Sequence, residues 1–395
     1  MKILWVAKMY FDLTVDRTTW IEMIRNLQRE GHETKMLTAF KNEKLPFGLE
    51  GSIEYVPSIK HKVMNHISLN VSIFLWLFYF LFFWRADVVL LDFNTCVTAL
   101  PFAILRRLRV LRADFLLDVR SVPVETEGFL GSLSERLFGL SVRVARFWFQ
   151  GMTVITPFMK EVLAERFRLD RQRIGIWSSG VSVALFDPES IPHPERERKR
   201  EELGLKGKFV VMYHGSIGKR RGLHECVEAM SFLEGYSDIH LLVVGQGPAK
   251  EELERLTYRL NVQGRVTLKD TVPYEEIPLY ISVADVGILP FPNLMWWRVS
   301  SPIKLMEYLA MEKPVIVTDI EAHRDVLGSE GIGFFTASDE PARIADGILD
   351  AYHSREKLGE IGSKGRHLVE ERFTWERQAK SLNSFLQRWR TTWHT

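Results

Sequence analysis

The sequence predicts an α/β protein with two domains, each built on a parallel sheet covered by helices. Its 395 residues exceed the length of one ordinary domain, and a hydrophobic share of 46% is enough for two cores. Short apolar segments alternate with helical segments in both halves, and a segment rich in proline and charge separates the halves. Buried strands that alternate with helices favour a parallel sheet, so both domains are predicted to be Rossmann-like.

The first half opens with a β-rich segment, KILWVAK, at residues 2–8. Apolar residues then recur at helical spacing over residues 19–30, and Gly31 ends that helix. Further strands are expected at residues 34–38, 87–91, 114–118, 152–155 and 174–177.

The boundary between the halves is expected near residue 188. Pro188, Pro192 and Pro194 precede the charged run ERERKR, a composition typical of an exposed connector. The chain is therefore divided into a first domain (1–187), a linker (188–207), a second domain (208–372) and a terminal segment (373–395).

The second half repeats the alternation of strands and helices. Its strands are expected at residues 209–213, 240–244, 266–268, 286–289 and 314–317. Ligands of such sheets bind at the carboxyl ends of the strands, so the loops that follow these strands are the candidates for a binding site.

Charge and cysteine content exclude several classes of protein. Lys and Arg number 52 and Asp and Glu 50, so no excess of positive charge indicates a nucleic-acid partner. The two cysteines, Cys96 and Cys226, lie far apart, which argues against a disulfide scaffold or a zinc knuckle and fits a reducing compartment. No paired carboxylates indicate a metal site.

Residues 71–84, VSIFLWLFYFLFFW, form an uncharged and strongly aromatic run. Fourteen residues are too few to span a bilayer, which takes about 20. Three interpretations stay open: a buried core helix, a helix that lies in a membrane interface, and a contact with another subunit. The arginines that follow in the next helical segment favour membrane contact.

Two glycine-containing loops follow strands of the second half. The first, YHGSIGKRRGL at residues 213–223, combines glycines with Lys219, Arg220 and Arg221 before a helix, a pattern suited to a diphosphate or simply to a solvated turn. The second, VVGQGP, contains Gly245 and Gly247 and is explained equally well by a tight turn. Neither matches a P-loop or GxGxxG, which weakens the ATPase and dehydrogenase interpretations.

The segment SSPIKLMEYLA at residues 300–310 predicts a helix with a polar face. Ser300 or Ser301 can cap a helix that Pro302 begins. Lys304 and Glu307 are three residues apart and share one face, so they form either an intrahelical pair or part of a site. A carboxylate at this position can accept hydrogen bonds from two neighbouring hydroxyls, such as those of a ribose.

These motifs together resemble the donor domain of family-4 glycosyltransferases of the GT-B type. The likeness rests on YHGSIGKRRGL, VVGQGP and SSPIKLMEYLAMEKPVIV, which occur in the family's order. The opening KILWV, the segment IGIWSSGVSVALFDP and the closing Phe373-Thr374-Trp375 extend it over nearly the whole chain. The resemblance implies a GT-B fold, in which two Rossmann-like domains face each other across a cleft and a C-terminal helix packs back on the N-terminal domain.

The resemblance also implies roles for single residues. Glu307 is expected to bind the donor ribose, and Arg221 the diphosphate. The full set expected at the nucleotide-sugar site is Gly215, Ser216, Lys219, Arg220, Arg221, Gly245, Gly247, Thr271, Val272, Ser300, Ser301, Pro302, Ile303 and Glu307. The expected catalytic residues are Glu307, Arg221, Lys304, Asp118 and Arg120.

The sequence departs from the family pattern at several positions. Val299 stands where relatives often carry a second glutamate, and Ser216 stands where an arginine is common. Thr14-Val15 replaces a Gly-Gly pair in the acceptor loop. Asp118-Val119-Arg120 replaces a histidine, so Asp118 and Arg120 either face the acceptor or form a buried ion pair.

The expected function is transfer of a sugar from a UDP- or GDP-sugar to a glycan or lipid-linked acceptor, with retention, in polysaccharide biosynthesis and without a cofactor. The expected location is the cytoplasm, with a peripheral contact to the inner face of the membrane through residues 71–84. Two alternatives stay open: a non-hydrolysing sugar-nucleotide epimerase, and a catalytically weak GT-B binding or scaffold subunit.

Overall fold

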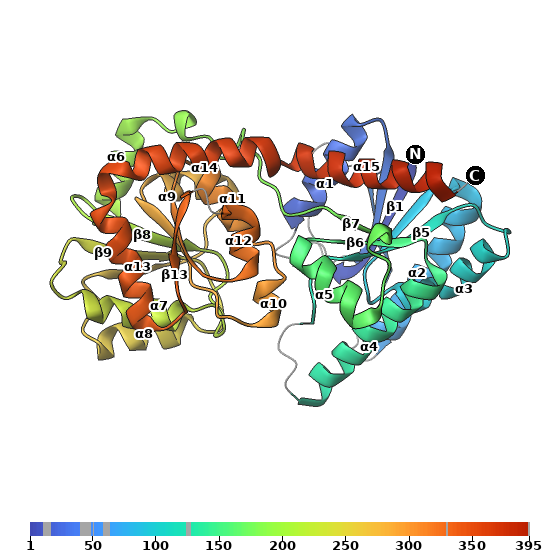
Figure 1. The fold of residues 1–395 in the computed structure, drawn as a ribbon, viewed down its shortest axis with the longest axis horizontal. Coiled ribbons are helices and arrows are strands. Elements are labelled where there is room, and N and C mark those ends of the chain that lie inside the picture. The colour runs from blue at the N-terminus through green and yellow to red at the C-terminus, as the bar shows by residue number, and fades with distance from the viewer. Residues whose placement is uncertain are drawn as a thin grey trace. The chain divides into compact units, whose positions relative to one another are not determined.

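The computed structural model describes residues 1–10, 17–39, 49, 51–57, 64–123, 128–328 and 331–393. It divides into two compact units (Figure 1). The first unit combines Met1–Ser178 with Trp375–Thr395, and the second unit is Ser179–Thr374. The division lies before the predicted boundary at residue 187, because residues 179–207 pack with the second unit. The acceptor-loop residues Thr14 and Val15 lie outside the described residues.

The first unit contains a seven-stranded parallel sheet in the order β3-β2-β1-β4-β5-β6-β7. Its centre is apolar and buried on both faces, as parallel sheets require. The order reverses between β1 and β4, the position at which doubly wound sheets bind ligands. The strands are β1 (Lys2–Tyr10), β2 (Glu33–Ala39), β3 (Ile53–Val56), β4 (Val88–Leu91), β5 (Asp114–Val119), β6 (Gly151–Val154) and β7 (Ile174–Ile176).

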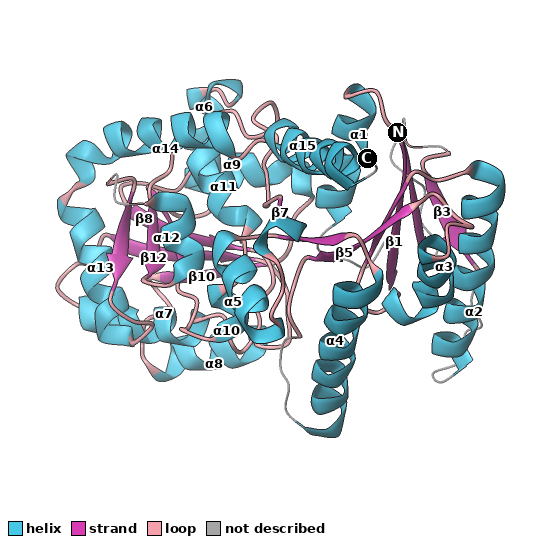
Figure 2. Cartoon of the chain, turned by 45° about the vertical axis from the view of Figure 1, so that its right-hand side comes forward, coloured by secondary structure: helices cyan, strands magenta, loops and turns pink. Residues whose placement is uncertain are grey.

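Helices cover both faces of this sheet, with α1 and α15 on one face and α3 and α4 on the other (Figure 2). The helix α3 packs between α2 and α4. A π-helical turn, η1 (Phe80–Trp84), continues α2 directly. The helices are α1 (Arg17–Arg29), α2 (Met64–Tyr79), α3 (Cys96–Arg107), α4 (Gly128–Trp148), α5 (Pro157–Phe167) and α15 (Trp375–Trp393), with a short 3-10 turn η2 (Arg171–Arg173).

The C-terminal helix α15 belongs to the first unit, as predicted. It packs on α1 and against β7. Gly175 and Gly151 make room for its Phe385, since a Cβ atom on Gly175 would lie 2.5 Å from the Phe385 ring.

The second unit contains a six-stranded parallel sheet in the order β10-β9-β8-β11-β12-β13. Here too the order reverses beside the first strand, between β8 and β11. The register pairs Val211 with Leu241 on one side and with Val286 on the other. The strands are β8 (Phe209–His214), β9 (Ile239–Val244), β10 (Val266–Lys269), β11 (Val286–Leu289), β12 (Val315–Thr318) and β13 (Gly333–Thr336).

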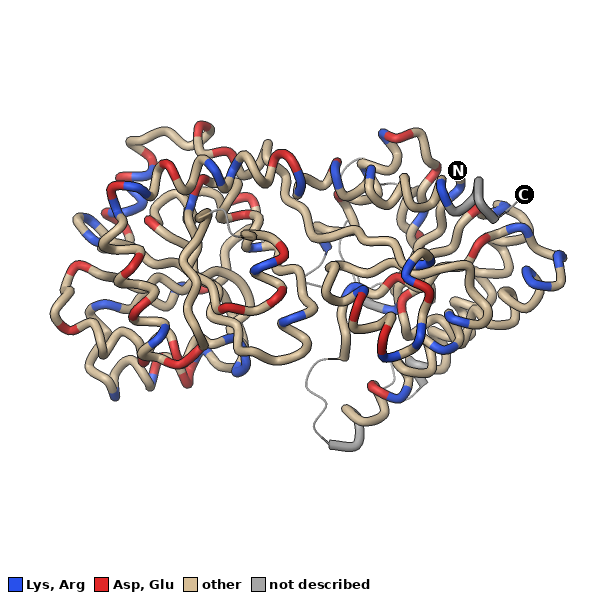
Figure 3. The backbone as a smooth tube through the Cα atoms, in the orientation of Figure 1, with Lys and Arg blue, Asp and Glu red and all other residues tan. Residues whose placement is uncertain are grey.

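The remaining helices surround this second sheet. Residues 188–207, expected to be a linker, contain α6, whose Arg200 donates to the Val283 carbonyl at 2.6 Å. Basic and acidic residues are interspersed along this unit (Figure 3). The helices are α6 (His193–Glu202), α7 (Leu223–Ala229), α8 (Lys250–Arg259), α9 (Ile277–Ser282), α10 (Met295–Arg298), α11 (Ile303–Ala310), α12 (Glu321–Leu327), α13 (Pro341–His353) and α14 (Leu358–Arg372), with 3-10 turns η3 (Pro188–Ser190), η4 (Met230–Leu233), η5 (Tyr274–Glu276) and η6 (Arg355–Lys357).

Candidate functional site

The candidate site lies where β8 and β11 end in the second unit. Gly215 follows β8 with a φ of +115°, a conformation that favours glycine. The VVGQGP loop packs against it, because a Cβ atom on Gly245 would lie 1.9 Å from the Gly215 oxygen and one on Gly247 2.2 Å from the Ile217 oxygen. Gly245 and Gly247 thus serve to bring two backbones together, and the loop after β8 is held by that contact.

Glu307 lies on α11 and is 2% exposed. Its Oε1 accepts a hydrogen bond from the Tyr274 hydroxyl at 2.8 Å, and its Oε2 lies 3.2 Å from Nε2 of His214. The second contact is a close approach without hydrogen-bond geometry. A carboxylate has about four acceptor positions, so Glu307 keeps the capacity to bind two further hydroxyls.

Tyr308, the next residue, fixes α11 against β8. Its hydroxyl donates to the Met212 oxygen at 2.9 Å and accepts from the His214 amide at 3.1 Å. Its ring fills the space above Gly287, where a Cβ atom would lie 2.5 Å away. Burial raises the pKa of Tyr308 well above its usual value, so this hydroxyl stays protonated. The orientation of Glu307 is therefore set by a rigid contact between strand and helix.

Lys304 extends from the first turn of α11 toward the loop after β8. A Cβ atom on Gly215 would lie 3.4 Å from its Nζ, so glycine leaves room for the lysine side chain. The ammonium group also lies 5.5 Å from the Tyr213 ring centre and 5.7 Å from that of Phe291. Lys304 and Gly215, both predicted site residues, are thus brought together.

The basic residues of the loop are held by two tryptophans of α10. The guanidinium of Arg221 lies 5.0 Å from the Trp297 ring, and that of Arg220 lies 5.5 Å from the Trp296 ring. Trp297 also donates from Nε1 to the Arg220 oxygen at 2.8 Å. Lys219, in contrast, is exposed and pairs with Glu252 at 3.4 Å.

Beneath these residues lies a stack of three rings. Trp297 stacks on Phe291 with ring centres 4.2 Å apart, and Phe291 stacks on His323 at 5.8 Å. His323 is fully buried and donates from Nδ1 to the Thr318 oxygen at 2.7 Å. Burial lowers the pKa of His323 to about 4, so the imidazole is neutral near pH 7. Tyr274, Trp296, Trp297 and His323 were not predicted, because aromatic residues in loops and short helices carry no spacing signal.

The predicted serine cap of α11 is wrong. The helix begins at Ile303 after an N-cap Pro302 that makes no side-chain hydrogen bond to it. Ser300 instead donates to the Trp297 oxygen at 2.7 Å, and the Ser301 hydroxyl accepts from the Ser179 amide at 3.1 Å. Pro302 at the N-cap offers no side-chain acceptor to α11, and the backbone amides at the start of a helix suit an anion.

Thr271 and Val272 lie on the loop after β10, the edge strand, with Thr271 exposed and Val272 half-buried. The same loop leads to Tyr274, which contacts Glu307. This loop thus reaches the candidate site through a residue that the sequence did not indicate.

Asp118, in the first unit, is buried and accepts hydrogen bonds from Trp5 Nε1 at 3.0 Å, Trp177 Nε1 at 3.1 Å and Thr153 Oγ1 at 2.6 Å. Burial raises its pKa above the usual value, an effect that Arg120 and these donors oppose. Arg120 lies 3.4 Å from the Trp177 ring centre and donates to the Trp177 oxygen at 2.8 Å. Asp118 therefore supports the tryptophans from inside the sheet, and its catalytic role stays a prediction.

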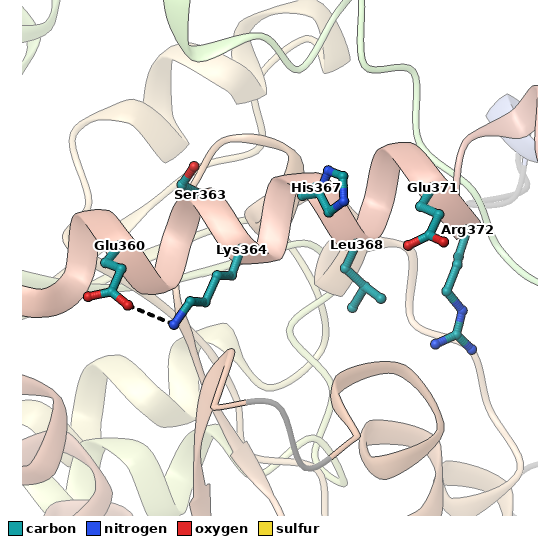
Figure 4. A pocket seen from close by; sticks show the side chains of 7 residues that line it. All are labelled: Glu360, Ser363, Lys364, His367, Leu368, Glu371 and Arg372. Carbon is teal, nitrogen blue, oxygen red and sulfur yellow. Dashed lines mark hydrogen bonds and ion pairs between the residues drawn. The ribbon is translucent and has the colours of Figure 1, made fainter.

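No group of three or more His, Cys, Asp or Glu residues suited to a metal occurs in the described ranges. A hollow of about 820 Å³ is lined by one face of α14 and contains none of the predicted site residues (Figure 4). Its Lys364 pairs with Glu360 at 2.7 Å across that face. We regard it as open surface and place the candidate site at the ends of β8 and β11.

The fold defines the chain as a GT-B protein. The crystal structure of Anabaena Alr3699/HepE in complex with UDP superposes with a TM-score of 0.76 at 15% identity and covers 98% of this chain and 100% of that one. The structure of WaaG, a glycosyltransferase involved in lipopolysaccharide biosynthesis, gives a TM-score of 0.72 at 17% identity, with 98% and 99% covered. The predicted GT-B fold is confirmed.

Residues 195–368 match the model of the family Glycosyl transferases group 1. Spore coat protein SA of Bacillus subtilis is 25% identical over 249 residues, which are 60% of this chain and 64% of that protein. Alpha-D-kanosaminyltransferase of Streptomyces kanamyceticus is 26% identical over 213 residues, 52% and 53% of the two chains. The chain thus aligns with less than two thirds of the length of these relatives.

Proposed function

We propose that this chain is a retaining glycosyltransferase of family 4. It would move a sugar from a UDP- or GDP-sugar to a hydroxyl of a glycan or of a lipid-linked intermediate, in polysaccharide biosynthesis and without a cofactor. Two relatives support a nucleotide-sugar donor: a mannosyltransferase of Mycobacterium tuberculosis is named as GDP-mannose-dependent, and Anabaena HepE was crystallised with UDP-glucose.

The observation that carries this proposal is the convergence of opposite charges at the point where the sheet order reverses. Glu307 offers acceptors to the ribose, while Lys304 and Arg221 offer positive charge to the diphosphate. The first turn of α11 adds backbone amides. Positive groups that are already in place stabilise the charge that develops on the departing nucleoside diphosphate.

Tyr274 determines how the ribose reaches Glu307. Because Glu307 is 2% exposed and its Oε1 is bonded to the Tyr274 hydroxyl, the donor must displace this hydroxyl or bind beside it. The loop of residues 270–276 would therefore adjust when the donor binds.

The proposal is tested with a panel of nucleoside diphosphates and their sugars, UDP and GDP included. At least one should raise the thermal midpoint of the wild type, since a ligand that binds the folded state stabilises it by mass action. The wild type should hydrolyse the matching nucleotide-sugar slowly when no acceptor is present, and it should consume this donor faster when an acceptor is added. Conversion of the nucleotide-sugar to its epimer in the absence of acceptor would favour the epimerase. Binding of the nucleotide-sugar without any turnover would favour the scaffold subunit.

A further inference from the structure

The exposed apolar side chains of the molecule are concentrated on three neighbouring helices of the first unit. Of the 19 exposed large hydrophobic residues among the described ones, 15 lie between Ile67 and Phe147. We call these the apolar face: Ile67, Val71, Phe74, Leu75, Phe78, Tyr79, Phe82, Phe83, Val97, Leu108, Val110, Leu133, Leu137, Leu140 and Phe147. Soluble monomers rarely expose so large a set in one region, so the apolar face indicates a partner.

The three helices form one layer. Phe74 of α2 contacts Phe102 of α3 with ring centres 4.9 Å apart, and Thr98 of α3 donates to Asn70 of α2 at 3.2 Å. Arg107 at the end of α3 donates to the Phe147 oxygen of α4 at 3.1 Å. The residues of the apolar face therefore lie on neighbouring helices of one layer, and they extend well beyond the run at residues 71–84.

The helix is longer than the sequence suggested, since α2 and η1 run without a break from Met64 to Trp84. The 18 residues Ile67–Trp84 suffice to cross a membrane by length and composition, yet 28% of them are buried inside the unit. The buried ones form a stripe at helical spacing: Leu69, Ile73, Leu77, Phe80 and Leu81.

That stripe and several polar bonds tie the helix to the sheet. Ser72 donates to the Pro57 oxygen at 2.8 Å, and Trp84 donates from Nε1 to Glu33 at 2.8 Å. If α2 spanned a membrane, these hydrogen bonds would break and the buried stripe would lose its contacts with the core of the unit. The two faces of α2 thus have different roles, one packed in the unit and one left for a partner.

Charge identifies the partner. Seven exposed arginines lie on the same helices and in the segments that follow them, and Glu135 is the single exposed acidic residue in the described segments 64–123 and 128–148. A second copy of the chain would bring like charges together across a symmetric contact, whereas anionic headgroups complement them. The arginines are Arg85, Arg107, Arg109, Arg112, Arg136, Arg143 and Arg146.

We infer that the apolar face rests on an anionic lipid bilayer, with α2, α3 and α4 lying in the interface and not spanning it. Aromatic residues suited to the interface, Trp76, Tyr79 and Trp148, occur within this layer. This inference goes beyond the proposed transferase activity and is tested without it.

The test is co-sedimentation of the full chain with phosphatidylcholine vesicles, with and without phosphatidylglycerol. The wild type should bind the anionic vesicles at low salt and less at high salt, since salt screens the arginines. The double variant Leu75→Gln and Phe83→Gln removes two side chains that are 62% and 70% exposed. The partition coefficient of this variant should fall by more than about tenfold, because each substitution removes an apolar side chain that the bilayer would bury.

The matched control carries the same type of change away from the face: Phe232→Gln and Tyr258→Gln, at positions 62% and 71% exposed in the second unit. This control should bind vesicles as the wild type does, and both variants should keep the wild-type thermal midpoint. Failure of the wild type to sediment with anionic vesicles would overturn the inference. An equal loss of vesicle binding in the two double variants would overturn it too. So would analytical ultracentrifugation that shows a dimer of the wild type and of the control, but a monomer of the Leu75→Gln and Phe83→Gln variant.

Discussion

Trp297 shows how single residues prepare the candidate site for a diphosphate. It lies between Arg221 and the Phe291 ring, and its Nε1 donates to the backbone of Arg220. The loop after β8 is thus held from below by an aromatic ring as well as by its own backbone. This makes Trp297 a positioning residue, which acts through the two arginines.

The variant Trp297→Phe keeps the stacked ring and removes the hydrogen bond to the Arg220 oxygen. Because one such bond contributes about 1 kcal/mol, affinity for the preferred nucleoside diphosphate should fall about fivefold. Calorimetric titration measures the change, and a thermal midpoint near that of the wild type shows that the fold is retained. An unchanged affinity would exclude this role for Trp297.

His323 makes the second unit sensitive to acid. Its folded-state pKa of about 4 lies below the ordinary value of 6.5, so the unfolded chain binds more protons between these pH values. Stability should therefore fall as the pH drops from 6.5 toward 4, by at most about 3 kcal/mol for this group. His240, whose pKa burial also lowers to about 4, contributes in the same direction.

The variant His323→Gln isolates this effect, since glutamine can still donate to the Thr318 oxygen. Urea unfolding at pH 7.5 and pH 5 should give a smaller loss of stability for the variant than for the wild type. Equal losses in the two proteins would show that His323 does not titrate on unfolding.

Among the elements, the turn between the basic loop and α7 depends most on a glycine. Gly222 has a φ of +74°, and a Cβ atom there would lie 1.8 Å from the Pro290 oxygen. Gly222→Ala should therefore destabilise the second unit by about 2 to 4 kcal/mol in urea unfolding, through steric overlap and a strained backbone. Gly235→Ala, which meets no atom within 4 Å, is the control and should stay within about 0.5 kcal/mol of the wild type. Equal effects of the two substitutions would contradict this account.

The sequence predicted the central strands of both sheets and the edge strands β7 and β10, and it missed the edge strands β3 and β13. Central strands are buried on both faces and appear as continuous apolar runs, as in VVLL of β4. The edge strands have mixed burial, so GFFT of β13 carries no such run. The strands β3 and β13 are recognised by their pairing with β2 and β12, which a single sequence does not display.

The candidate site was predicted where glycine, charge and strand ends coincide, as at Gly215, Lys304 and Glu307. The partners of these residues could not be predicted, because they depend on contacts distant in the sequence. Tyr274 reaches Glu307 across 33 positions, and Trp297 reaches Arg220 across 77. The donors to Asp118 could not be predicted for the same reason, since Trp5 and Trp177 come from opposite ends of the first unit.

At the scale of the whole molecule, the C-terminal helix stabilises the unit that does not contain the candidate site. Phe385 of α15 is 5% exposed and packs on Gly151 and Gly175. Phe385→Ala should destabilise the first unit by about 3 to 5 kcal/mol, whereas Ser384→Ala, at an exposed position of the same helix, should not. Urea unfolding measures both, and nucleotide affinity should stay unchanged. A loss of nucleotide affinity in folded Phe385→Ala would contradict the assignment of the site to the second unit alone.

The central claim is that the second unit binds a nucleoside diphosphate through Glu307, and calorimetric titration of Glu307→Gln tests it most directly. Glutamine keeps the size of the side chain and an acceptor for Tyr274, so the fold should persist, while the charge offered to the ribose is lost. Since hydrogen bonds to a charged group contribute about 1.5 to 3 kcal/mol, affinity for the diphosphate found in the panel should fall about 10- to 100-fold. Wild-type affinity in a folded Glu307→Gln protein would contradict the claim.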